Sequence, residues 1–168
     1  MDGFHLYKKE LDQMPNPEMM HFRRGAHFTF NPEVLLSKLK QVKSGQVTSF
    51  PAFSHSEGDP QEDAITVDPF LTQVVVVEGL YLFCDLDVWR DIRDLIDYRV
   101  FIEGDLDSTM EQLVQRNSEC LQMSIEDTRY RVERSDKLNA LEVMQSKAFA
   151  HRVVSFQTKP QELIIIKN

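Results

Sequence analysis

The 168-residue sequence predicts an α/β fold with a mostly parallel sheet. Val74–Val77 is a run of four β-branched residues without polar alternation, which is typical of a central strand buried on both faces. The run stops at Glu78 and Gly79, where a strand is expected to turn toward a ligand site. Short β-rich runs also alternate with helical segments of about ten residues, as in βαβ units.

The first part of the chain is predicted to begin with a strand end that turns at residues 1–6. Asn31 and Pro32 indicate a helix start, because asparagine caps free N–H groups and proline fits the first turn. The expected elements are a short helix over Lys8–Met14, a loop over Met19–Phe30, a helix from Asn31 to Ser44, an edge strand over Val47–Phe53 and an exposed loop over His55–Asp63.

The second part is predicted to continue the alternation of helices and strands. Ser108 and Ser124 each open a capping box, so that a helix is expected to start at each. The expected elements are a helix capped by Asp87, a strand over Arg99–Ile102, the two serine-capped helices, and two β-like runs over Arg152–Phe156 and Leu163–Ile166.

Composition restricts the class of partner. The formal net charge of −8 argues against a general nucleic-acid or membrane-surface binder, and no apolar run is long enough to span a membrane. Cys84 and Cys120 are isolated, which predicts free thiols in a reducing, cytoplasmic compartment. The first residues lack the pattern of a signal peptide. A small-molecule partner is therefore expected. The sequence leaves open whether the protein forms a homo-oligomer.

Acidic and polar side chains directly follow three predicted strands: Asp2 with His5, His55 with Asp59, and Glu78. Because the carboxyl ends of parallel strands meet at one edge of a sheet, these groups are expected to share a cleft. A carboxylate there can accept a proton from a hydroxyl group or hold Mg²⁺, as phosphoryl transfer requires. Arg116 could cover a phosphate group, although an arginine on a solvated helix face is the alternative reading.

Other motifs are missing from the sequence. The five histidines have no zinc-ligand spacing. Neither Gly-x-Ser-x-Gly nor Gly-x-Gly-x-x-Gly occurs, and a Gly-x-x-x-x-Gly-Lys-Ser/Thr loop is also missing.

Five ordered motifs, MDGFHL, RRGAHFTF, FPAFSHSEGDP, VVVVEGLYLF and RYRVERSDKLNA, resemble the uridine kinase-like group of P-loop kinases. They are most similar to a fungal and bacterial branch that carries Asp-Gly-Phe-His and is related to pantothenate kinase and phosphoribulokinase. The resemblance covers roughly residues 1–140. It implies a three-layer α/β P-loop fold and transfer of the ATP γ-phosphate, with Mg²⁺, to a hydroxyl group of a nucleoside, pantothenate-like or sugar-like substrate.

The resemblance also implies roles for individual residues. Asp2 resembles the acid beside the acceptor hydroxyl, as base or Mg²⁺ organiser, and Glu78 resembles the strand-end acid near Mg²⁺. Arg116 resembles the arginine of a helical lid, here expected at about 108–136, that approaches the ATP phosphates. Four further residues match positions on the acceptor-substrate side: His5, Arg23, Arg24 and His55.

Relative to this family, the sequence lacks the first strand, the phosphate-binding loop and the first helix before its Asp-Gly-Phe-His motif. Residues 1–168 are therefore expected to form a single but partial kinase-like domain that binds ATP poorly and is inactive as this fragment. One interpretation is that this chain is a truncated product of an active kinase. The alternative is that it is a shortened, non-catalytic paralogue that acts as a binding or regulatory module. Neither interpretation identifies the acceptor substrate.

Overall fold

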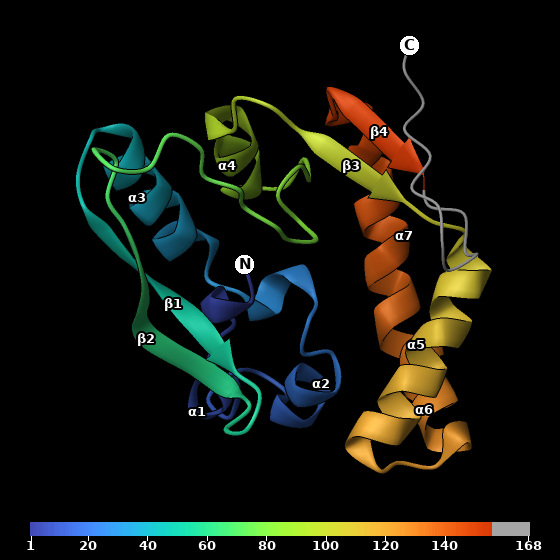
Figure 1. The fold of residues 1–168 in the computed structure, drawn as a ribbon. Helices are drawn as coiled ribbons and strands as arrows, with labels where there is room; N and C mark the ends of the chain where they lie inside the picture. The colour runs from blue at the N-terminus through green and yellow to red at the C-terminus, as the bar shows by residue number, and fades with distance from the viewer. Residues whose placement is uncertain (156–168) are drawn as a thin grey trace. The chain divides into compact units, whose positions relative to one another are not determined.

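The computed structural model describes residues 1–155, which fall into two compact units that divide after Asp97 (Figure 1). The first unit contains η1 (Asp2–Phe4), α1 (Lys8–Leu11), α2 (Pro17–Phe22), η2 (His27–Thr29), α3 (Pro32–Lys43), β1 (Thr48–Ser54), β2 (Asp59–Val67) and α4 (Trp89–Leu95). The second contains β3 (Val100–Glu103), α5 (Leu106–Leu121), α6 (Ile125–Arg131), the π-helical turn η3 (Val132–Asp136), α7 (Lys137–Gln145), η4 (Ser146–Phe149) and β4 (Arg152–Ser155).

An antiparallel hairpin of β1 and β2 is the sheet of the first unit (Figure 1). Its register pairs Thr48 with Val67 and Ser54 with Asp59, and it is irregular between Phe50 and Ala52. The loop expected over His55–Asp63 is therefore wrong beyond the turn at residues 55–58. Most residues of β2 are exposed, so the strand lacks the apolar alternation by which a sequence reveals a half-buried strand.

Helices cover the hairpin and build the apolar core of this unit. The helix predicted from Asn31 is confirmed as α3, with the Asn31 side chain accepting from the Val34 N–H at 3.1 Å. It packs against β1 and α4 and buries Leu35 and Leu39. The core also contains several large residues from the rest of the unit: Phe4, Leu11, Phe30, Tyr81, Trp89 and Ile92.

The loop predicted over Met19–Phe30 is wrong, because α2 and η2 occupy most of it. Asn16 and Pro17 start α2 with the same cap-and-proline signal as the start of α3, and the Asn16 side chain accepts from the Met19 N–H at 3.3 Å. At α4 the expected cap is also wrong: Val88 holds the capping position, without a side-chain hydrogen bond.

The central strand predicted at Val74–Val77 is wrong for the described residues. The run pairs with none of the four strands in residues 1–155, and the side chains of Val74 and Val76 are 77% and 86% exposed. Apolar β-branched residues favour a strand only where neighbouring strands supply hydrogen bonds and cover both faces. Among residues 1–155, Glu78 consequently follows a segment that pairs with no strand.

The second unit contains the parallel strand pair of the described chain. β3 and β4 pair from Val100 with Arg152 to Glu103 with Ser155, which confirms both predicted strands. Met110 and Val114 of α5 pack with Val132 to form an apolar core. The start predicted for α5 at Ser108 is wrong, because the Asp105 side chain accepts from the Ser108 N–H at 2.9 Å and the helix begins at Leu106.

Ser124 caps α6 as predicted, with its Oγ accepting from the Asp127 N–H at 3.0 Å.

The run Leu163–Ile166 lies outside the described residues. Cys84 is buried, Cys120 is exposed, and both are free thiols. No helix among residues 1–155 has the length and apolar character needed to cross a bilayer.

Candidate functional site

The segments that carry the two predicted catalytic acids, Asp2 and Glu78, meet in the first unit. The Met1 amino group donates to the Glu78 carbonyl oxygen at 2.5 Å. The Met1 side chain also fills the space beside Gly79, where an added Cβ would lie 2.2 Å from the Met1 Sδ. Both acidic side chains are exposed. Tertiary packing therefore joins the backbone of Met1, the neighbour of Asp2, to that of Glu78, although 75 residues lie between the two acids.

His5 is fixed beside Asp2 by a backbone contact and by two aromatic rings. Its Nδ1 lies 2.8 Å from the Asp2 carbonyl oxygen, and its ring centroid lies 4.0 Å from that of Phe30 and 5.1 Å from that of Phe53. Burial lowers the pKa of His5, despite the favourable contact with Asp2. A carbonyl oxygen can only accept, so Nδ1 carries the proton and Nε2 of the neutral ring is left as an acceptor.

His55 lies in the exposed turn between β1 and β2, and Phe53 connects it to His5. The ring centroids of Phe53 and His55 are 5.3 Å apart, in an edge-to-face arrangement. His5 and His55, from two segments of the chain, therefore both contact the Phe53 ring.

Arg24 and Arg23 differ in what they contact. Nη2 of Arg24 donates to the Leu6 carbonyl at 2.8 Å and to Oδ1 of Asp59 at 2.7 Å, and its Nη1 donates to the Gly58 carbonyl. The Arg24 side chain is only 13% exposed, so it ties the hairpin turn to the start of the chain. The Arg23 guanidinium lies over the Phe28 ring, 5.8 Å from its centroid.

The Arg24 contact also controls the charge of Asp59. Burial alone would raise the pKa of Asp59, but the Lys8 backbone N–H and the Arg24 guanidinium both donate to its carboxylate. The net effect is a lowered pKa, and Asp59 is an anion at neutral pH. The sequence predicted that Asp59 lies with His55 in a functional site. The structure shows that Asp59 also forms an ion pair with Arg24, which sequence reasoning missed.

Arg116, the predicted lid arginine, is exposed on α5 in the second unit. Its Nε and Nη2 both lie 3.4 Å from the Asn117 side-chain oxygen, a loose contact for a guanidinium. The stretch expected as a helical lid, about 108–136, consists of α5, α6 and η3. Its helical nature is confirmed, and its action as a lid stays a prediction.

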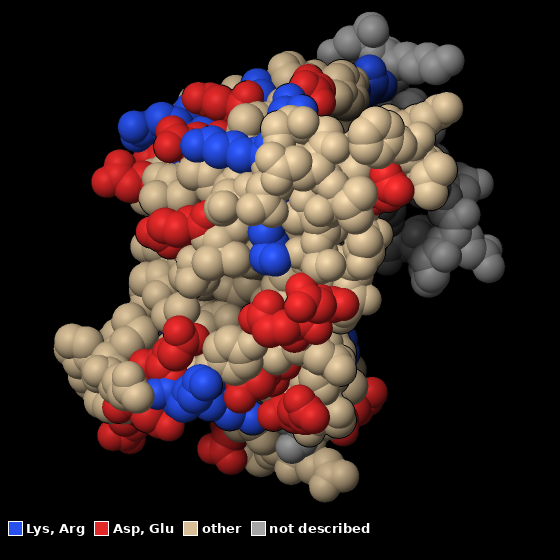
Figure 2. Space-filling model, turned by 90° about the vertical axis from the view of Figure 1, so that its left-hand side faces the viewer, with Lys and Arg blue, Asp and Glu red and all other residues tan. Residues whose placement is uncertain are grey.

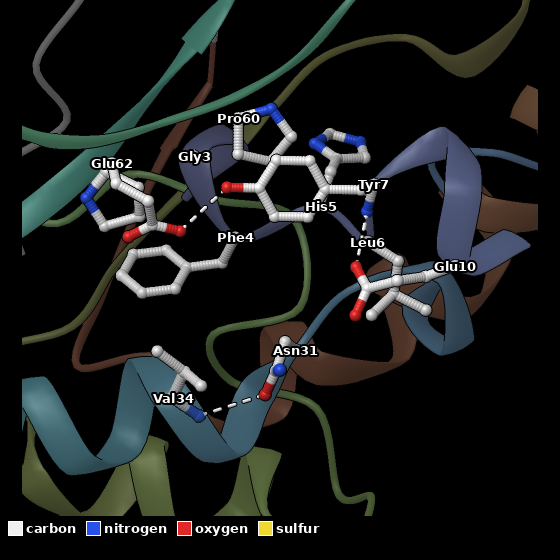
Figure 3. A pocket seen from close by; sticks show the side chains of 11 residues that line it. Gly3, Phe4, His5, Leu6, Tyr7, Glu10, Asn31, Val34, Pro60 and Glu62 are labelled. Carbon is white, nitrogen blue, oxygen red and sulfur yellow. Dashed lines mark hydrogen bonds between the residues drawn. The ribbon is translucent and has the colours of Figure 1, made fainter.

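A pocket of about 80 Å³ lies next to the predicted residues and contains others that sequence reasoning missed (Figure 3). His5 and Gly3 line it, whereas Asp2, His55 and Glu78 do not. Its lining is completed by Phe4, Leu6, Tyr7, Glu10, Asn31, Val34, Pro51, Pro60 and Glu62. No sequence signal marked Tyr7 or Glu62, because the hairpin that brings β2 beside the start of the chain was not predicted.

Tyr7 connects the two acidic side chains of this pocket. Its O–H donates to Oε1 of Glu62 at 2.9 Å, and its backbone N–H donates to Oε2 of Glu10 at 2.7 Å (Figure 3). Burial, followed by the hydrogen bond to Glu62, raises the pKa of Tyr7 to about 12. The hydroxyl group therefore stays protonated at neutral pH and remains a donor to Glu62.

Asp2 and Glu78 are carboxylates that could contribute to holding Mg²⁺, whereas the sequence offers no motif for the ATP phosphates. Mg²⁺ is usually held by one or two carboxylates with waters and phosphate oxygens, which Asp2 and Glu78 could supply in part. No group of three or more His, Cys, Asp and Glu side chains suited to a metal ion forms within residues 1–155. The ATP phosphates need a loop of backbone N–H groups and a lysine, and the sequence contains no such motif. The face of the described residues drawn in Figure 2 also shows no broad basic area.

Comparison with known proteins gives a consistent result. A family model described as phosphoribulokinase / uridine kinase family matches residues 10–157. An ATP-dependent kinase-like protein, notR', from Aspergillus versicolor is 32% identical over 155 residues, covering 88% of each chain. The ATP-dependent kinase YFH7 of Lachancea thermotolerans is 30% identical over 196 residues, covering 95% of this chain and 56% of that protein.

Solved structures give the same picture of the fold. A Silicibacter protein assigned as a fructose transport system kinase superposes with a TM-score of 0.81 and 26% identity, over 91% of this chain and 71% of that one. YFH7 of Saccharomyces cerevisiae, described as a circularly permuted P-loop kinase, superposes with a TM-score of 0.77 and 25% identity, over 95% of this chain and 57% of that one. The α/β P-loop kinase-like fold is thus confirmed, and the chain spans little more than half of both YFH7 proteins.

Proposed function

Because the chain belongs to the phosphoribulokinase / uridine kinase family, we propose that it forms the acceptor side of an ATP-dependent small-molecule kinase. The reaction would transfer the γ-phosphate of ATP to a substrate hydroxyl group with Mg²⁺, in the reducing cytoplasm. The observation that carries the proposal is the hydrogen bond that joins the Met1 backbone to Glu78 beside His5. This contact holds the segment of Asp2 and His5 against the segment of Glu78, which supports the proposal because hydroxyl phosphorylation needs acidic and acceptor groups near the hydroxyl.

Each residue has a distinct task in this proposal. Asp2 would accept the proton of the substrate hydroxyl or orient it, and Glu78 would be the residue that helps to hold Mg²⁺. Bound Mg²⁺ would supply charge neutralisation at the transferred phosphoryl group. His5 orients the acceptor, because its Nε2 is an acceptor held by the Asp2 carbonyl and by the rings of Phe30 and Phe53. Arg23, Arg24 and His55 shape the acceptor side, and Arg116 approaches the phosphates.

We propose further that the 168-residue chain by itself lacks appreciable kinase activity. Removing one positioned donor to a developing charge costs about 10²–10³ in rate, and the sequence lacks the whole phosphate-binding loop. The residues on the acceptor side would then be present without the group that holds the phosphoryl donor.

The test compares the 168-residue chain with a form extended at its N-terminus by a strand, a Gly-x-x-x-x-Gly-Lys-Ser loop and a helix taken from a relative. Isothermal calorimetry with Mg²⁺-ATP and a phosphoryl-transfer assay with a panel of small hydroxyl compounds are the measurements. The extended form is expected to bind ATP and to lose at least about 10²-fold in kcat on Asp2→Ala or Glu78→Gln.

Glu57→Gln in the exposed hairpin turn is the charge-matched control and should leave kcat unchanged. Equal turnover by the short and extended forms would contradict the proposed need for the loop. Full activity of the Asp2→Ala variant would remove Asp2 from the chemistry.

A second candidate is a non-catalytic binding or regulatory module. The observation that favours it is the match with notR', which covers 88% of both chains, so that a kinase-like relative of similar length exists. Under this alternative, neither the short nor the extended form binds ATP, and the short chain binds a protein or small-molecule partner saturably. Calorimetry on the two forms separates the candidates.

A further inference from the structure

The pocket beside His5 is lined by apolar and by acidic side chains (Figure 3). Phe4, Pro51 and Pro60 are buried and provide apolar walls, whereas Glu10 and Glu62 are exposed at the edge. A volume of about 80 Å³ exceeds the roughly 10–15 Å³ that one water needs on the same kind of measure. The pocket therefore accommodates a fragment of a small organic molecule.

The polar groups of the pocket are mainly hydrogen-bond acceptors. Glu10 and Glu62 each use one oxygen to accept from Tyr7 and keep a second oxygen for a ligand. His5 presents Nε2 as an acceptor, because Nδ1 donates to the Asp2 carbonyl. The Tyr7 O–H is already donated to Glu62. The Asn31 amide NH₂ is then the side-chain donor that remains on the lining, since its oxygen caps α3.

The neighbouring cations do not change this balance. Arg24 donates to the Leu6 and Gly58 carbonyls and to Asp59, and it is not part of the lining. Lys8 donates from Nζ to the Glu57 carbonyl at 2.6 Å. Lys9 lies over the Tyr7 ring, with Nζ 5.2 Å from the centroid, and also does not line the pocket. An anionic ligand group would thus face two carboxylates without a cation on the lining to neutralise it.

We infer that this pocket binds hydroxyl compounds that carry no anionic group, and that it thereby selects the acceptor of the proposed kinase. Ligand hydroxyl groups would donate to Glu10, Glu62 and His5, and carbon atoms would pack on Phe4 and Pro60. Phosphorylated sugars and hydroxy acids are disfavoured by like-charge repulsion. The identification of the bound compound as the phosphoryl acceptor rests on the proposed function. The preference for uncharged hydroxyl compounds does not depend on it.

The experiment measures binding without ATP, by ligand-observed NMR and by amide shift changes in the ¹⁵N-labelled 168-residue chain. Two matched pairs differ by one anionic group: fructose against fructose 6-phosphate, and glycerol against glycerate. The neutral member of each pair is expected to bind at least about fivefold more tightly, the factor that one like-charge contact in water is worth. Shift changes are expected at Tyr7 and Glu62.

The variants Glu62→Gln and Glu10→Gln test the cause of this preference. Glutamine keeps an oxygen that can accept from Tyr7, so the fold is retained while the charge is lost. Each substitution should reduce the preference for the neutral ligand, and Glu57→Gln should leave it unchanged. Tighter binding of the anionic members, or a preference that survives both substitutions together, would overturn the inference.

The outcomes also separate this inference from the proposed function. Phosphorylation of anionic acceptors by the extended form would retain the kinase proposal and overturn the selectivity. Selective binding of neutral compounds, with no transfer by the extended form, would retain the pocket inference and overturn the kinase proposal.

Discussion

Gly3→Ala is expected to be the most destabilising single-methyl substitution in the first unit. Gly3 is buried in η1, which packs against β1. A Cβ built on Gly3 would lie 2.1 Å from the Pro51 carbonyl oxygen, 2.5 Å from the Pro51 carbonyl carbon and 3.0 Å from the Ala52 nitrogen. All three are backbone atoms of β1, so no side-chain rotation can make room.

The magnitude follows from the displacement that the methyl group demands. The gap to the Pro51 oxygen must grow by about 0.9 Å to reach 3.0 Å, below which Cβ contacts essentially do not occur. Overpacking a well-packed site costs about 1–3 kcal/mol, and a clash with backbone belongs at the upper end of that range. We therefore expect a loss of about 3 kcal/mol in the free energy of unfolding, a large part of the stability of a domain.

Urea denaturation followed by circular dichroism measures this loss, with two glycine controls. A Cβ on Gly79 would meet three Met1 side-chain atoms, of which the Sδ and Cγ can rotate away, so Gly79→Ala should cost less than Gly3→Ala, whose neighbours are all backbone atoms. A Cβ on Gly45 meets nothing within 4 Å, but its φ of +82° makes Gly45→Ala cost about 1 kcal/mol through backbone strain. A Gly3→Ala cost equal to or below that of Gly45→Ala would refute the reasoning.

Three further predictions concern charge, exposure and proton affinity. Arg24→Ala should cost about 2 kcal/mol, because it removes the donor to two carbonyls and one of the two donors to the Asp59 carboxylate; the folded-state pKa of Asp59 is lowered below 3.8, so in urea titrations this difference should be complete above about pH 4 and should shrink as pH falls further, and a constant difference would contradict the ion pair. Val76→Thr should change stability by less than about 0.5 kcal/mol in thermal denaturation, since the side chain is 86% exposed, whereas a loss above about 1 kcal/mol would indicate a buried strand. Glu62→Gln should lower the Tyr7 pKa from about 12 in an ultraviolet titration without restoring its ordinary value, because burial, the largest cause, is unchanged, and an unchanged pKa would exclude Glu62 as a cause.

The candidate site was predictable where a motif carries its own local meaning. MDGFHL placed Asp2 and His5 on one short segment, and η1 indeed holds them together through the Asp2 carbonyl and the His5 ring. The same motif could not show that Arg24 is occupied by Asp59 and two carbonyls, because those partners come from other segments of the chain. The acidic pocket around Tyr7 was missed for the same reason, since it depends on β2 folding back onto β1.

By itself, the sequence determined the local elements whose signals lie within a few residues. The caps at Asn31 and Ser124 set α3 and α6, because a side-chain oxygen and the N–H groups that it satisfies are three residues apart. Tertiary structure alone decided the fate of Val74–Val77 and the meeting of Met1 with Glu78. An apolar run indicates only that burial would be favourable, whereas burial and the approach of two distant acids depend on which other segments pack beside them.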